Sequence, residues 1–114
     1  MAFSRQDTNG FIQRFWRAID MGNGMSTFVY VTTDAATAVE VSGYISDQSI
    51  IDQIQVGDMV IVYQVGALTD GKDIQTELAE GITDRTEHLV VANDGTTVDL
   101  SPDVSGGAAV TYTA

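Results

Sequence analysis

Turn-forming residues divide this chain into short runs rich in β-branched and aromatic residues, and this spacing constrains the fold more than any other feature. Asp70-Gly71 and Asn93-Asp94-Gly95 each stand between two such runs, and Gly57-Asp58 precedes another; these residues favour turns because Gly and Asn tolerate positive φ. About seven short strands with turns roughly every ten residues are typical of a small barrel or sandwich. We therefore expect an all-β fold, a small antiparallel barrel or a jelly-roll-like sandwich.

The predicted strands follow from runs of Val, Ile, Thr and aromatic residues. Met59 to Val65 is the most apolar run and is expected to be a central strand. The others are Phe28 to Thr33, Ala38 to Ser42, Ile74 to Leu78, Thr86 to Ala92, Thr97 to Leu100 and Ala109 to Thr113. Alternation predicts inward-facing pairs in three of these strands: Val39 and Val41, Leu89 and Val91, and Val98 and Leu100.

One short helix is expected inside this β pattern. Ser46 or Asp47 has the residue type of a helix N-cap. Ile50, Ile51 and Ile54 follow at a spacing that places them on one side of a helical turn. Gly57 then ends the segment.

The N-terminal segment 1–24 differs from the body at 25–114, which we expect to be a single β domain. Its apolar residues Phe11, Ile12, Phe15, Trp16 and Ile19 are spaced as one face of a helix over 9–20. Two interpretations remain open: a helix that closes over the core of the same chain, or an arm whose aromatic face is buried on a partner. The second makes Phe11, Arg14, Phe15, Trp16 and Arg17 candidate partner-binding residues.

The charge distribution is also uneven. Sixteen acidic residues against five basic ones give a net charge of −11, which excludes a basic surface for bare nucleic acid. Residues 1–24 nevertheless carry a net +1, because three of the five basic residues lie there against two aspartates. The acidic body is consistent with a solvated surface, and the basic segment with an arm that docks on an acidic neighbour.

Length and composition fit one globular domain. A chain of 114 residues with 44% apolar residues buries enough surface to fold alone. The absence of cysteine excludes disulfides and thiolate metal sites. We expect no signal peptide, since no apolar core follows a basic start, and no membrane span, since no run approaches about 20 apolar residues.

No pattern of catalytic residues stands out, and we expect a non-enzyme without a metal or cofactor. The single histidine, His88, is expected at a surface or rim position, and one histidine without cysteine is poor zinc chemistry. Asp70, Asp73 and Asp94 lie near Gly-containing turns but lack the order of an EF-hand loop, so we interpret them as turn residues. A phosphate loop and a Gly-x-Ser-x-Gly motif are both missing.

Residues 28–65 resemble a known family. The resemblance rests on three stretches, Tyr30 to Val39 (YVTTDAATAV), Ser42 to Ile45 (SGYI) and Val56 to Val60 (VGDMV). In this order they are similar to the small capsid decoration (cement) proteins of tailed phages, of the epsilon15-like group. In that group an aromatic strand leads into Thr-x-Asp. A Gly-Tyr pair follows, and a Gly-Asp pair then precedes the next strand.

The resemblance implies a structural virion protein on the capsid exterior. Its partner would be the major capsid protein, whose neighbouring subunits it would bridge, and it would itself be a homo-oligomer (dimer or trimer) without direct contact to nucleic acid or membrane. A C-terminal strand with Val110 and Tyr112 on one face would add to a neighbour's sheet, or else be a frayed terminus or the domain's own edge strand. Alternatives are a tail or neck β module and a small carbohydrate- or ligand-binding barrel that uses Trp16, Tyr44 or Tyr63 as a stacking platform.

Overall fold

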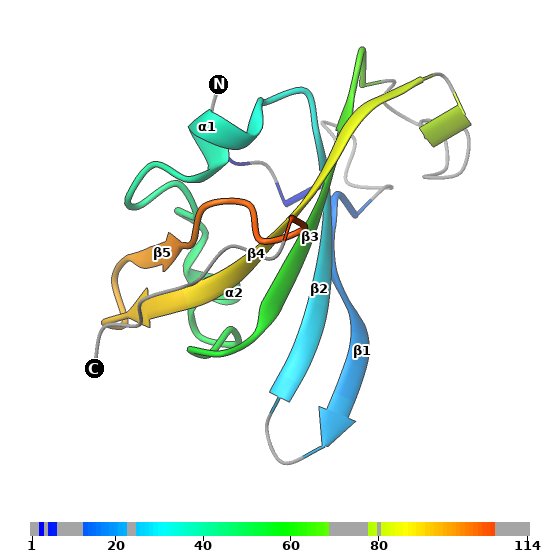
Figure 1. Cartoon of the computed structure of the whole chain (residues 1–114). Helices are drawn as coiled ribbons and strands as arrows, with labels where there is room; N and C mark the ends of the chain where they lie inside the picture. The colour runs from blue at the N-terminus through cyan, green and yellow to red at the C-terminus, as the bar shows by residue number, and fades with distance from the viewer. Residues whose placement is uncertain are drawn as a thin grey trace.

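The computed structural model describes residues 3, 5–6, 13–22, 25–68, 78–79 and 81–106, and these residues contain one mixed sheet and two short helices (Figure 1). The strands are β1 (Phe15–Gly22), β2 (Met25–Thr32), β3 (Met59–Val65), β4 (Ile82–Asn93) and β5 (Val98–Leu100), and the helices are α1 (Ala36–Val39) and α2 (Gln48–Ile51).

The sheet is open, with five strands in the order β1-β2-β3-β4-β5. Strands β2 and β3 are parallel, whereas the other neighbouring pairs are antiparallel. A parallel pair needs a crossover connection, and the segment that contains α1 and α2 provides it. The mostly β architecture is therefore as predicted, but the closed barrel, the fully antiparallel pairing and the count of seven strands are wrong for the described residues. Two of the predicted strands, Ile74 to Leu78 and Ala109 to Thr113, lie almost wholly outside them.

Strands β2, β3 and β5 and helix α2 lie where the sequence predicts them. Asp47 caps α2, since its side chain accepts a hydrogen bond from Ser49 N (2.9 Å). The turn between β4 and β5 contains Gly95 with a φ of 91°, a left-handed conformation that favours glycine.

Helix α1 replaces the strand predicted at Ala38 to Ser42. This segment is rich in alanine, the residue with the highest helix propensity, and the helical turn separates the two valines that were expected to share a face. Val39 is buried, and Val41 is 60% exposed.

The helix predicted over 9–20 is wrong for the residues that the structure describes, because Phe15–Gly22 is strand β1. It pairs antiparallel with β2, with Phe15 opposite Tyr30 and Trp16 opposite Val29, so this part of the N-terminal segment belongs to the same sheet as the body. The aromatic residues fit a helical spacing but also have high β propensity, and the edge of β2 provides hydrogen-bond partners that a helix would not use.

Strand β4 has the opposite phase from the one predicted. Thr86, His88 and Val90 are buried, whereas Leu89 and Val91 are only partly buried. His88, expected at the surface, is 0% exposed. Inward-facing Val98 and Leu100 are confirmed.

One hydrophobic cluster lies between the sheet and the segment with the two helices, which cover the same side of the sheet in Figure 1. Its buried members are Phe15, Phe28, Tyr30, Val39, Ile45, Ile50, Ile51, Ile54, Val60, Val62, Val90, Val98 and Leu100. The cluster reaches the edge strand β1, and the candidate site opens there.

Candidate functional site

The stretch that carries the family resemblance forms a partly buried hydrogen-bond network. Tyr44 OH donates to Asp34 Oδ2 (2.5 Å), so Tyr30 OH donates to Tyr44 OH (2.8 Å). Burial, and then the hydrogen bond to Asp34, raise the pKa of Tyr44 well above its usual range, which keeps the phenol protonated as a donor. This network therefore holds α1, and the loop that follows it, against β2.

The Gly-Asp pair of the same stretch also has a structural role. The buried carboxylate of Asp58 accepts hydrogen bonds from Ser26 N (3.0 Å) and Gln55 N (2.9 Å). Gly57 has a φ of 97°, and its N–H donates to Val90 O (2.9 Å). The pair thus ties the start of β2 and the loop before β3 to β4.

His88 lies in the interior with both ring nitrogens occupied. Nδ1 is 2.8 Å from Ser101 O, an acceptor, so Nδ1 carries a proton, and Nε2 shares a hydrogen bond with Thr86 Oγ1 (2.8 Å). Glu40 Oε2 lies 3.9 Å from Nδ1. A threonine, a histidine and a glutamate meet here, but the fully buried imidazole has no access to a substrate, so we interpret the cluster as part of the core.

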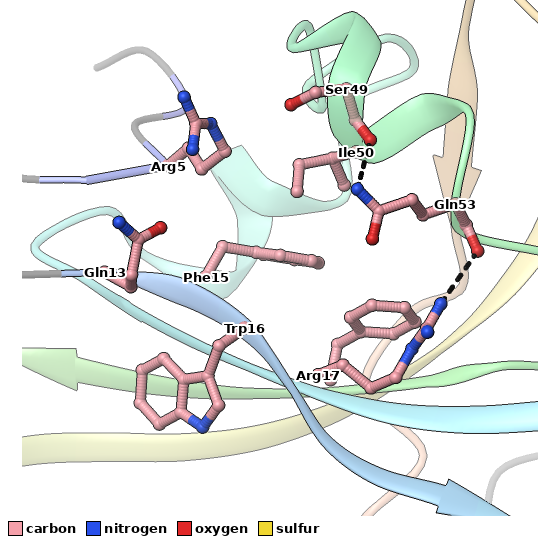
Figure 2. Close-up of a pocket in the computed structure, with 9 residues that line it drawn as sticks. Arg5, Gln13, Phe15, Trp16, Arg17, Ser49, Ile50 and Gln53 are labelled. Carbon is pink, nitrogen blue, oxygen red and sulfur yellow. Dashed lines mark hydrogen bonds between the residues drawn. The ribbon is translucent and has the colours of Figure 1, made fainter.

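A pocket of about 380 Å³ opens between β1 and α2. Its lining residues come from four parts of the chain, and Figure 2 draws all of them: Arg5, Gln13, Phe15, Trp16, Arg17, Phe28, Ser49, Ile50 and Gln53. Phe15, Phe28 and Ile50 are buried and form an apolar floor. The volume is near the lower end of the range of ligand pockets, roughly 300–1,000 Å³.

The rim of this pocket is polar and cationic. Arg5 and Gln13 lie on one side of the Phe15 ring, and Arg17 and Gln53 lie on the other (Figure 2). Arg5 Nε donates to Asp47 Oδ2 (2.9 Å). The hydrogen bond from Ser49 and then that from Arg5 lower the pKa of Asp47. Arg5 is therefore already paired with a carboxylate.

Two contacts hold Arg17 at the rim, and neither of them involves a carboxylate. Its guanidinium lies 5.3 Å from the centroid of the Phe28 ring, a cation–π geometry, and Nη2 donates a long hydrogen bond to Gln53 O (3.4 Å). Gln53 in turn donates to Ser49 O (2.8 Å). Within the described part of the chain, Arg17 has no acidic partner.

The structure brings three of the predicted partner-binding residues to this pocket, namely Phe15, Trp16 and Arg17. Arg14 is beside them in sequence but is 2% exposed, and its backbone links Arg5 to Val31. An exposed arm is therefore the wrong description for Arg14 and Phe15, whose side chains are buried. Phe11, Val110 and Tyr112 lie outside the described residues.

Sequence reasoning missed the pocket residues that come from outside the predicted arm. Gln53 and Arg17 meet across 36 positions of the chain, a long-range contact that no local pattern encodes. The basic character of the N-terminal segment was the signal for Arg5. The predicted helix contained Ser49 and Ile50, but nothing indicated that it would face β1.

Of the three aromatic residues considered as stacking platforms, only Trp16 lines the pocket. Tyr44 donates a hydrogen bond to Asp34. Tyr63 lies under Arg85, and the Arg85 guanidinium is 5.6 Å from the centroid of the Tyr63 ring.

Among the described residues, no group of three His, Asp or Glu side chains is arranged to hold a metal ion, and none of the helices is long and apolar enough to cross a membrane.

Comparisons of the chain with known protein families, with curated proteins and with solved structures found no match.

Proposed function

We propose that this chain is a structural virion protein, a capsid decoration protein that binds the outer surface of a phage head and stabilises contacts between major capsid subunits. The observation that carries the proposal is the order of the Thr-x-Asp, Gly-Tyr and Gly-Asp elements over residues 28–65. These residues have structural roles, as Asp34, Tyr44 and Asp58 illustrate. The resemblance is therefore one of framework rather than of catalytic chemistry.

The pocket beside β1 supports an interaction role. An apolar floor next to a cationic rim has the character of a contact site for another protein, because buried aromatic residues and arginine are enriched in interfaces. Each contact on a shell can be weak, since a clamp that touches two subunits gains from effective concentration.

The test is co-sedimentation of the purified chain with expanded capsid shells that lack the decoration protein. The expected result is saturable binding with a fixed number of copies per shell. Unexpanded shells, whose subunit contacts differ, serve as the control. A chain that stays in the supernatant with expanded shells at micromolar concentration would overturn the proposal.

A second candidate function, a small carbohydrate-binding module, is favoured by one observation. Trp16 lines the pocket together with Gln13 and Gln53, and an aromatic ring beside amide groups suits a sugar ring, whose faces are apolar and whose hydroxyls need partners. A glycan array probed with the wild-type chain and with Trp16→Ala tests this alternative. Binding that is lost in the variant supports it, and a blank array removes it.

A further inference from the structure

We propose that the pocket between β1 and α2 binds a short acidic segment of a partner protein, with one apolar side chain on the floor and an adjacent carboxylate on Arg17. The inference deepens the proposed function and rests on it in one respect, namely that the partner is a protein. It adds the chemistry of the segment and the residue that selects it.

The floor selects an apolar group. Phe15, Phe28 and Ile50 are buried within the chain's own core, and the pocket exposes a small part of their surface between the polar rim residues. A volume of about 380 Å³ accommodates one large side chain with neighbouring backbone, but not a folded element. Burial of a Leu or Phe side chain there contributes through the apolar area removed from water.

Arg17 selects a carboxylate. Its guanidinium has five N–H donors, and the contacts with the Phe28 ring and Gln53 O hold it in place. A positioned guanidinium binds a carboxylate through two parallel hydrogen bonds at a reduced entropic cost. Arg5, the other cation at the rim, is already paired with Asp47, so Arg17 is the cation that the structure offers to a ligand.

The charge of the whole chain restricts the ligand further. At a net charge of −11, the chain repels extended polyanions such as nucleic acid and anionic membrane surfaces. A single carboxylate presented at Arg17 escapes most of that repulsion, because charges beyond about 8–10 Å are screened at physiological ionic strength. A short segment with one or two acidic residues beside an apolar residue fits both conditions.

Trp16 provides a direct assay, because it lines the pocket and is the single tryptophan of the chain. The probe is the synthetic peptide acetyl-Gly-Glu-Phe-Asp-amide, which has two acidic residues beside one apolar residue, titrated to millimolar concentration while tryptophan fluorescence is recorded. Two control peptides separate the parts of the site: one has Asn and Gln in place of the acidic residues, and one has Ala in place of Phe. We expect saturable binding of the first peptide and at least tenfold weaker binding of both controls.

The variant Arg17→Gln tests the residue, and Arg85→Gln is its matched control. Both remove one positive charge, but Arg85 lies on β4, where it is paired with Glu87 (2.6 Å) and is not among the pocket residues. Arg17→Gln is expected to weaken peptide binding roughly tenfold, whereas Arg85→Gln leaves it unchanged. If circular dichroism shows that Arg17→Gln does not fold, Arg17→Lys, which keeps the charge but loses the planar fork, is expected to bind several-fold more weakly than wild type.

Three results would overturn the inference: no saturable fluorescence change with the acidic peptide, equal binding of the neutral peptide, or equal loss in the two arginine variants. The shell assay separates this inference from the proposed function. Wild-type binding of Arg17→Gln to shells would remove the pocket inference and leave the function standing. A chain that binds the peptide specifically but does not bind shells would support the pocket inference and overturn the proposed function.

Discussion

Substitution of Asp58 by alanine tests whether the Gly-Asp element is structural. Asp58 accepts from Ser26 N (3.0 Å) and from Gln55 N (2.9 Å). In Asp58→Ala both N–H groups lose their acceptor. Ser26 is buried, so its donor carries the cost of an unsatisfied buried group, about 1–3 kcal/mol.

The magnitude follows from these two donors. Gln55 is exposed, and water can replace its lost acceptor, so its share is about 0.5–1 kcal/mol. Removal of a buried carboxylate also removes its desolvation cost, which keeps the expected loss in the free energy of unfolding at about 1.5–3 kcal/mol. For a chain with a net stability on the order of 10 kcal/mol, the melting temperature should fall by roughly 10 °C.

The assay is urea unfolding followed by tryptophan fluorescence and circular dichroism. Asp99→Ala is the matched control, since Asp99 accepts one exposed hydrogen bond from Ser42 Oγ (2.7 Å), and its loss should cost less than about 0.5 kcal/mol. If Asp58→Ala is no less stable than Asp99→Ala, the structural role of the Gly-Asp element is refuted.

The remaining predictions concern ionisation and the packing of α1. The hydrogen bonds from the backbone of Thr96 and Thr97 lower the pKa of Asp94 to about 2, so the carboxyl resonance of Asp94 should titrate near pH 2 in the folded chain. The contribution of these hydrogen bonds to the stability of the fold is present above the unfolded pKa of about 3.9 and is lost as the pH falls through 2. A titration midpoint of about 3.9 in the folded chain would contradict this prediction. Because the pKa of Tyr44 is raised, at least one of the four tyrosines should stay protonated in an ultraviolet titration through about pH 10 until the chain unfolds. The stability of the fold should decline as the pH rises above that value. Reversible ionisation of all four tyrosines in the folded state would contradict the hydrogen bond from Tyr44 to Asp34. Val39→Ala should lower the free energy of unfolding in urea by about 1–3 kcal/mol and Val41→Ala by less than about 0.5 kcal/mol, because Val39 is buried and Val41 is exposed. Equal losses in the two variants would favour the strand predicted from sequence over helix α1.

Local signals predicted the elements whose structure depends on neighbouring residues. Strand β3 is a continuous apolar run, α2 begins at a capping aspartate, and β5 follows an Asn-Asp-Gly turn. Each signal acts within a few residues of the chain, so the sequence alone was sufficient to locate these elements.

Contacts between distant residues decided the elements that were predicted wrongly. The aromatic residues of β1 fit two periodicities, and the pairing of Phe15 with Tyr30 selects the strand. His88 can be buried because Ser101 O and Thr86 Oγ1 satisfy its ring nitrogens, and a partner 13 positions away cannot be identified from alternation. The pocket was not predicted, for the same reason: Trp16 and Arg17 were candidates for partner binding on an arm, whereas Gln53 joins them through the fold.

The measurement that tests the central claim most directly is the calorimetric disruption temperature of expanded shells with and without the saturating chain. We expect the chain to raise this temperature, because a ligand that binds only the assembled shell stabilises it by mass action. The rise should depend on chain concentration and continue to increase with the logarithm of the free chain concentration after every site is occupied. Shells that bind the chain but are disrupted at an unchanged temperature would contradict a stabilising role.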